Sequence, residues 1–159
     1  MPTNGENAHA LFAAAVGRPP VPGDWLEITQ ERINTFADAT DDHQFIHVDP
    51  EACAQYSPWG VPIAHGFLTL SLLTALIGSV PQDPRQAEGR LIGINYGFDR
   101  VRFLSPVTVG SRIRAVSAVD AVDLKDPDTV QVTQAVTVEI EGEAKPALAA
   151  AWITRHVYG

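Results

Sequence analysis

The chain has 159 residues, 45% of them hydrophobic and 19% charged, which is typical of one folded domain and excludes a disordered segment. Its formal net charge of -8 argues against nucleic acid or an anionic membrane as a partner, because both attract basic surfaces. A single cysteine, Cys53, allows no internal disulfide, and the N-terminus lacks a secretory signal pattern, so we expect a cytoplasmic protein.

The first half of the chain is predicted to be mostly helical. Residues 1–22 form an N-terminal extension that carries one short helix, which Gly17 ends. Thr29 and Asp49 are good helix caps, and Pro50 suits the first helical position after Asp49. The predicted helices cover residues 8–16, 29–39, 49–56 and 64–77, and one short strand covers 25–28. The last of these helices is apolar nearly all round, which predicts that it is buried on most sides.

From Arg90 onward the hydrophobic pattern changes to that of strands. Partial alternation of valines between 130 and 138 favours an antiparallel sheet with one face in the core. Helices followed by consecutive strands predict an α+β fold, with residues 1–159 as a single domain and the sheet wrapped around the helix at 64–77. The predicted strands cover residues 91–98, 100–103, 111–122, 129–141 and 145–157, with a turn at 120–128.

Two histidines and three carboxylates lie within residues 41–49, directly after a predicted helix. Asp42 and His47 are five positions apart in a non-regular segment, so a carboxylate and an imidazole can approach the same water molecule. Histidine titrates at about pH 6.5 when unperturbed, and can therefore accept or donate a proton in the cell. A proton-transfer enzyme is the leading hypothesis from these residues.

The same residues allow two other interpretations. Asp41 or Asp42 could cap a helix end or a turn while His47 packs beneath it. His43 and His47 have the spacing of two zinc ligands on a helix, but no Glu follows the first of them and Pro50 argues against a continuous helix. We therefore predict no metal site.

A second polar signal, His65-Gly66, opens the apolar helix. A glycine lets a ligand approach the backbone, and the free N–H groups of a first helical turn can stabilise an oxyanion. Alternatively, Gly66 only permits close packing of the helix on the sheet. His65 fits a structural hydrogen-bonding role better than a catalytic one, and Thr74, farther along the helix, could line a site.

These segments resemble a known family. Residues 42–50 (Asp-His-Gln-Phe-Ile-His-Val-Asp-Pro) and 62–72 (Pro-Ile-Ala-His-Gly-Phe-Leu-Thr-Leu-Ser-Leu) resemble the MaoC-like dehydratases, which are (R)-specific enoyl-CoA hydratases. The sequence of these segments is most similar to that of the nodulation-protein-N-like branch, and residues 94–111 extend the similarity. The usual family motif is Asp-x-Asn-Pro-x-His. Gln44 and Phe45 replace its Asn and Pro, while Asp42 and His47 are intact.

The resemblance implies a hot-dog fold, in which a curved antiparallel sheet surrounds a central helix and the segment 42–47 overhangs it. It also implies a homodimer and reversible hydration of a trans-2-enoyl-CoA to an (R)-3-hydroxyacyl-CoA. Asp42 and His47 would transfer protons and the Gly66 N–H would polarise the thioester. No cofactor is expected beyond the coenzyme A of the substrate. The residues expected to contact substrate are His65, Phe67, Thr74, Asn95, Arg100 and Arg102, with the two arginines as candidates for the phosphates.

The sequence leaves two rival functions open. A hot-dog thioesterase would carry its carboxylate on the central helix, and residues 66–77 contain no Asp or Glu. A non-catalytic acyl-thioester-binding module would tolerate loss of the Asp42/His47 pair, and both residues are present.

Overall fold

The computed structural model describes residues 1–159 and contains six α-helices, one 3-10 helix and six strands. The helices are α1 (Asn4–Ala13), α2 (Gln30–Thr40), α3 (Phe45–Val48), α4 (Pro50–Tyr56), α5 (Gly66–Ser71), α6 (Leu73–Ile77) and the 3-10 helix η1 (Pro84–Ala87). The strands are β1 (Val21–Pro22), β2 (Leu26–Glu27), β3 (Arg90–Phe103), β4 (Arg112–Asp126), β5 (Thr129–Ile140) and β6 (Leu148–Tyr158).

All strands belong to one antiparallel sheet in the order β1-β4-β5-β6-β3, with β2 also paired to β4. The two segments predicted at 91–98 and 100–103 are one strand, β3, whose register against β6 shifts between Phe98 and Arg100. The predicted turn at 120–128 is much shorter than expected, because β4 continues to Asp126 and pairs there with Thr129.

The central helix differs from the predicted continuous helix at 64–77. Ala64 and His65 precede the helix, since the Ala64 N–H donates to the Val107 carbonyl at 2.7 Å. The helix is then divided into α5 and α6 at Leu72 (φ -70°, ψ -11°). Side-chain hydroxyls compete for helix carbonyls at this point, since Ser71 bonds to the Phe67 carbonyl and Thr74 bonds to the Ser71 carbonyl.

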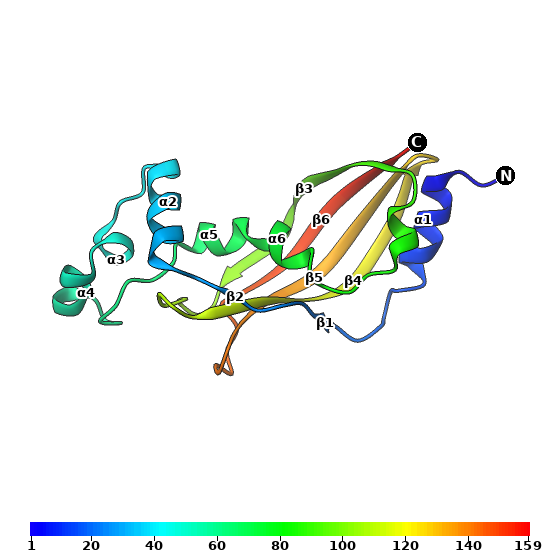
Figure 1. The fold of residues 1–159 in the computed structure, drawn as a ribbon. Coiled ribbons are helices and arrows are strands. Elements are labelled where there is room, and N and C mark those ends of the chain that lie inside the picture. The colour runs from blue at the N-terminus through cyan, green and yellow to red at the C-terminus, as the bar shows by residue number, and fades with distance from the viewer.

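The α5–α6 pair packs on the inner face of the curved sheet, as Figure 1 shows, and this is the arrangement of the hot-dog fold. Leucines provide most of the contact on the helical side. Alternate residues of β4, β5 and β6 meet them from the sheet, because successive side chains of a strand point to opposite faces. The buried residues of this main core include Leu68, Leu72, Leu73, Leu76, Ile113, Val136, Val138, Leu148 and Trp152.

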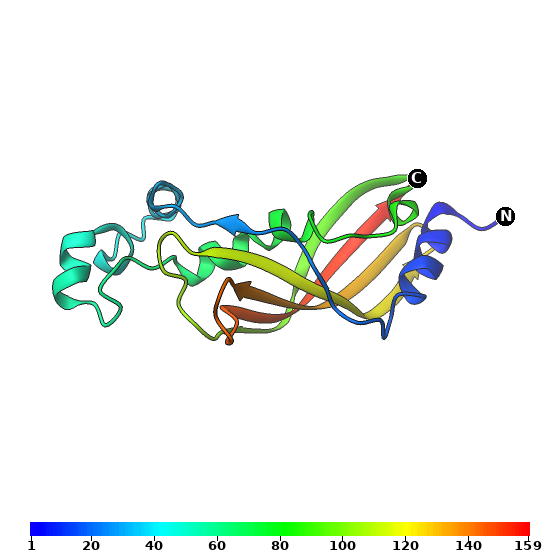
Figure 2. The ribbon, with the colours of Figure 1, turned by 60° about the horizontal axis from the view of Figure 1, so that its bottom comes forward.

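Helix α1 begins earlier than the predicted 8–16. Thr3 and Glu6 form a capping box that fixes its start, so residues 4–7, which precede the predicted helix, are also helical. The helix packs at the end of the sheet near both termini (Figures 1 and 2). There Phe12 stacks on His156 of β6 at 5.5 Å between ring centroids. The helix thus covers a second apolar cluster, made of Ala8, Phe12, Val130, Val132 and Tyr158.

Helices α2, α3 and α4 gather beyond the opposite end of the sheet (Figure 2). Thr29 and Asp49 cap α2 and α4 as predicted, each accepting a bond from a first-turn N–H. Asp41 ends α2 in the left-handed conformation (φ 58°), which Asp tolerates better than most residues. Cys53 is a free, buried cysteine. None of the helices combines the length and apolar character that a membrane crossing requires.

The contact between α1 and His156 gives a pH prediction. Burial, with a smaller contribution from the Arg90 charge, lowers the pKa of His156 from 6.5 to about 4. Between these values the unfolded chain binds a proton that the folded chain does not, so the free energy of unfolding should fall as pH falls from 6.5 towards 4. A shift of one pKa unit corresponds to about 1.4 kcal/mol of unfolding free energy. The His156 ring is partly exposed, which weakens this effect, so we expect the free energy of unfolding to fall by roughly 2 kcal/mol.

Urea unfolding at a series of pH values measures this loss. His156→Gln should flatten the pH dependence over that interval, whereas the control His43→Gln, at an exposed histidine, should leave it as in the parent protein. Equal pH dependence in the His156→Gln variant and the parent would contradict the assignment.

Candidate active site

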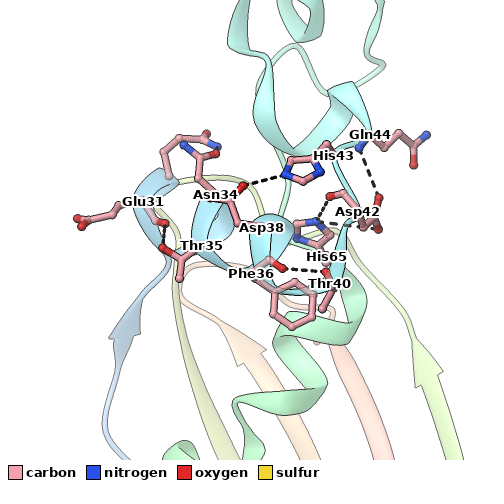
Figure 3. A network of polar contacts seen from close by, with 11 residues as sticks. Glu31, Asn34, Thr35, Phe36, Asp38, Thr40, Asp42, His43, Gln44 and His65 are labelled. Carbon is pink, nitrogen blue, oxygen red and sulfur yellow. Dashed lines mark hydrogen bonds and ion pairs between the residues drawn. The ribbon is translucent and has the colours of Figure 1, made fainter.

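The segment that follows α2 places Asp42 at the edge of a polar cluster (Figure 3). Its side chain is 49% exposed, and the Gln44 N–H approaches its Oδ1 at 3.4 Å. The backbone carbonyl of Asp42 accepts a hydrogen bond from Nε2 of His65 at 3.0 Å. That nitrogen also lies 4.0 Å from the carboxylate. Asp42 therefore presents a carboxylate that solvent and ligands can reach, on a backbone held by His65.

His47 lies in the single turn of α3, and its ring is buried. Its Nδ1 is 2.7 Å from the carbonyl oxygen of Ile63. A carbonyl can only accept, so Nδ1 carries the hydrogen and Nε2 of the neutral ring is left as an acceptor. Burial lowers the pKa of His47, the Ile63 hydrogen bond partly offsets this, and the neighbouring His65 lowers it further. The imidazole is therefore neutral at neutral pH and able to take a proton.

The main chain around His47 is fixed from two sides. Gln30 of α2 donates its side-chain amide to the His47 carbonyl at 2.7 Å. The Ile63 N–H donates to the Ile46 carbonyl at 2.9 Å, next to the bond that Ile63 accepts from the imidazole. These contacts join three segments that are distant in sequence and determine where the Nε2 lone pair points.

His65 connects the two residues of the predicted pair. Its ring is 2% exposed and stacks on His47 with 3.8 Å between centroids. Because its Nε2 donates to the Asp42 carbonyl, its Nδ1 bears the lone pair, and this atom is buried without a partner. Phe36 of α2 packs against the other side of the cluster at 4.9 Å from His65. The structure places His65 against Asp42 and His47, and its expected contact with substrate stays a prediction.

Each of Asp42, His47 and His65 has a potential metal ligand atom within 4.8 Å of the others. The two imidazoles, however, stack with only 24° between their planes. Nitrogen lone pairs lie in the ring planes, so they run side by side and do not converge as a tetrahedral site requires. His43, the other half of the predicted zinc spacing, pairs with Asp38 at 2.8 Å. The cluster suits proton transfer better than metal binding.

Gly66 is the first residue of α5, directly after His65. No acceptor within the chain bonds its N–H. A Cβ on Gly66 would lie only 2.9 Å from the ring of Phe103, so glycine is needed for this close approach. A pocket of about 230 Å³ adjoins it, lined by Thr69, Phe103 and Leu104 among others. Phe67 is exposed and meets Phe103 edge-on at 6.1 Å.

The remaining predicted substrate residues lie in two other places. Thr74 and Asn95 line a pocket between α6 and the sheet, farther along the central helix. Arg100 and Arg102 are exposed on β3. Their neighbours Val101 and Phe103 point inward, so alternation directs both arginines to the outer face of the sheet. The structure thus brings Asp42, His47, His65 and Gly66 together and leaves the two arginines outside this group.

Sequence reasoning missed Gln30, Phe36 and the carbonyl of Ile63. A carbonyl acceptor leaves no signal in the amino-acid sequence, because every residue has one. Gln30 and Phe36 have the ordinary pattern of a helix with one apolar face. Only the position of α2 over the segment 42–47 gives them a role.

Comparison with known proteins identifies the family of this chain. Residues 11–141 match the family described as MaoC like domain. The chain belongs to this family. The 3-hydroxyacyl-thioester dehydratase Z of Mycobacterium tuberculosis is 50% identical over 148 residues, which cover 93% of this chain and 95% of that protein. Nodulation protein N of Rhizobium meliloti is 49% identical over 142 residues, covering 89% and 86% of the two chains.

Two solved structures share the fold. The monoamine oxidase regulatory protein of an Archaeoglobus species superposes with a TM-score of 0.70 at 28% identity, over 91% of each chain. R-hydratase PhaJ1 of Pseudomonas aeruginosa gives a TM-score of 0.66 at 22% identity, over 91% of this chain and 83% of that one. The predicted MaoC-like membership and the α+β hot-dog fold are therefore both confirmed.

Proposed function

We propose that this member of the MaoC-like family is a hydro-lyase acting on 3-hydroxyacyl thioesters, and that it interconverts trans-2-enoyl-CoA and (R)-3-hydroxyacyl-CoA. The observation that carries the proposal is the cluster itself. An acceptor nitrogen of His47, an accessible carboxylate of Asp42 and the free N–H of Gly66 meet around one residue, His65. The activity in the name of the mycobacterial relative supports the same reaction class.

In the hydration direction the thioester carbonyl accepts a hydrogen bond from the Gly66 N–H. This bond withdraws electrons and makes the β-carbon electrophilic. A water molecule between Asp42 and His47 gives one proton to Nε2 of His47 while its oxygen bonds to the β-carbon. The α-carbon then takes one proton from the same pair, so that the net change is addition of one water across the double bond. Dehydration follows the same path in reverse.

The two side chains act as a unit. The lowered pKa of His47 keeps its Nε2 free to accept, and protonated His47 is stabilised by the nearby Asp42 carboxylate. Protons therefore belong to the pair rather than to either residue alone. The reaction as written needs no metal or redox cofactor, and coenzyme A enters as part of the substrate. Arg100 and Arg102 would contact its phosphates only from the outer face of β3.

A thioesterase activity fits the central helix less well than a hydratase activity. Hydrolysis in such enzymes would use a carboxylate on the central helix, and neither α5 nor α6 contains Asp or Glu. A binding module without activity would not need His47 in the tautomer that leaves Nε2 as an acceptor.

Purified protein mixed with crotonyl-CoA should remove the absorbance of the conjugated enoyl group without releasing free thiol. Asp42→Asn and His47→Gln should each lower kcat by about 10²-fold or more, because each removes a group that transfers or orients a proton. His43→Gln is the matched control, since this nearby histidine is exposed and pairs only with Asp38. Thiol release would indicate a thioesterase, and near-normal turnover by both variants would exclude the pair from the mechanism.

His65 is proposed as a positioning residue, because it contacts both members of the pair. His65→Phe keeps the stacked ring and removes the bond to the Asp42 carbonyl, so kcat should fall about ten-fold while KM changes little. His65→Gln retains an amide donor and should recover part of the loss. Steady-state kinetics with crotonyl-CoA measure both. A loss confined to KM would instead place His65 in substrate binding.

We also propose that the protein is a homodimer joined through β3. This strand forms an edge of the sheet, is fourteen residues long and has several exposed apolar side chains, among them Leu91, Ile92 and Tyr96. A long apolar edge invites pairing with a second β3 about a two-fold axis. Light scattering coupled to size exclusion should give twice the chain mass of 17.1 kDa, and Ile92→Lys should shift the mass towards the monomer. A monomeric parent protein would contradict the proposal.

A further inference from the structure

The inner face of the sheet is not uniformly apolar. It carries two apolar clusters, one beneath α5–α6 and one beneath α1. Between them stands a row of polar side chains from three adjacent strands, which we call the polar row: Ser117, Gln134, Thr154 and His156. Their cross-strand partners show that they face inward, since Ser117 pairs with buried Val136 and Gln134 with buried Trp152. Polar groups on a core-facing surface are costly unless they find hydrogen-bond partners.

Two pockets lie along this row and share Gln82 and Gln134. The first, of about 310 Å³, is the pocket between α6 and the sheet that contains Thr74, Asn95, Thr154 and His156. The second, of about 230 Å³, lies under the 3-10 helix η1 and contains Ser117, whose Oγ is buried without a partner. The gap between the two apolar clusters is thus hollow as well as polar.

The hydrogen bonds of the first pocket have a fixed direction. The Arg90 guanidinium lies 3.5 Å from Nδ1 of His156, and a guanidinium can only donate. Nε2 of His156 therefore carries the hydrogen and donates to Oγ1 of Thr154, 3.1 Å away. Because this oxygen already accepts, the hydroxyl hydrogen of Thr154 is free for another acceptor. Burial keeps His156 neutral by lowering its pKa to about 4, so this direction holds at neutral pH.

Two more donors face the same pocket. Asn95 uses its carbonyl oxygen to accept from the Trp152 indole at 2.8 Å, which leaves its NH₂ group available. The Gln134 side chain lines both pockets, and its amide can donate into this one. Thr154, Asn95 and Gln134 thus offer three donors, beside the positive charge of Arg90 at the rim. A ligand that satisfies them must carry an acceptor oxygen.

The pocket lies where the acyl chain of the proposed substrate would end. Thr74 follows Gly66 by eight residues along α5–α6, which corresponds to about 12 Å of helical rise. A thioester carbonyl held at the Gly66 N–H, with its chain running along the helices, would bring its distal carbons to Thr74 and Asn95. Resting on the proposed function, we propose that the enzyme prefers acyl groups whose far end bears an acceptor oxygen, as a hydroxyl or a carboxylate, over plain alkyl chains.

The preference arises because an acyl chain with a plain alkyl end would bury hydrogen-bond donors without giving them an acceptor. A methyl end would remove water from Thr154, Asn95 and Gln134 without giving them an acceptor, and a buried donor left unpaired is costly. Sites that hydrogen-bond a substrate group reject analogues that lack it more strongly than apolar pockets reject an extra methylene. A carboxylate would gain further from Arg90.

The test compares kcat/KM for trans-2-decenoyl-CoA with the same chain ending in a hydroxyl or in a carboxylate. The parent protein should favour at least one oxygenated substrate by about ten-fold or more. Thr154→Val should remove most of the preference, and Gln134→Leu provides a second variant if the first does not fold. The matched control is Thr133→Val, a threonine of β5 that alternates to the outer face and should leave the ratio unchanged.

The outcomes separate this inference from the proposed function. Hydration of crotonyl-CoA together with equal or better use of plain decenoyl-CoA would overturn the preference and leave the hydratase intact. Hydration of crotonyl-CoA with no turnover of any of the three long substrates would show that the chain does not reach the pocket, which also overturns it. Failure with crotonyl-CoA as well would remove the proposed function on which the inference rests.

Discussion

The contact on which the site depends is the packing of His65 between Asp42 and His47. One imidazole provides a hydrogen bond to the Asp42 carbonyl and a stacking surface for His47, and the next residue is Gly66. The ring links the segment that carries Asp42 and His47 to the start of α5, beside the hydrogen bonds that Ile63 makes with Ile46 and His47. It is almost fully buried, so water does not compete for the bond.

The buried position of His65 has a cost that the structure leaves visible. Its Nδ1 has no hydrogen-bond partner, although the atom is buried. Unsatisfied buried polar atoms are uncommon in folded proteins. A histidine at this position exchanges some stability for a fixed relation between Asp42, His47 and Gly66. The bond from His47 to the Ile63 carbonyl adds the second constraint, because it selects the tautomer.

The inner face of the sheet also combines an apolar core with polar groups. The helical layer is incomplete, because α5–α6 covers one part of the inner face and α1 covers another. A continuous helix from 64 to 77 would have been the simpler cover, but hydrogen bonds at Ser71 and Thr74 divide it, and Ala64 pairs with the connection after β3 instead. The polar row lies on the part of the face between these two covers, where Phe12 of α1 reaches His156 and Ser117 is buried. The same fold therefore provides an apolar core and a hollow that can discriminate ligands by their oxygen atoms.

Much of this protein is determined by local pattern. The caps at Thr29 and Asp49 and the alternation along β4 to β6 predict the α+β class and the bounds of α2, α4 and β5. The sequences of residues 42–50 and 62–72 predict the family. These features rest on interactions within a few residues, which the order of amino acids encodes directly.

The tertiary structure decided what depends on contacts between distant segments. It placed His65 against the pair, set the His47 tautomer through the Ile63 carbonyl and turned Arg100 and Arg102 to the outer face. It also brought Thr74, Asn95 and Thr154 to one pocket. Such contacts involve backbone atoms common to all residues and strand registers set by the whole sheet, so no short stretch of sequence carries their signal.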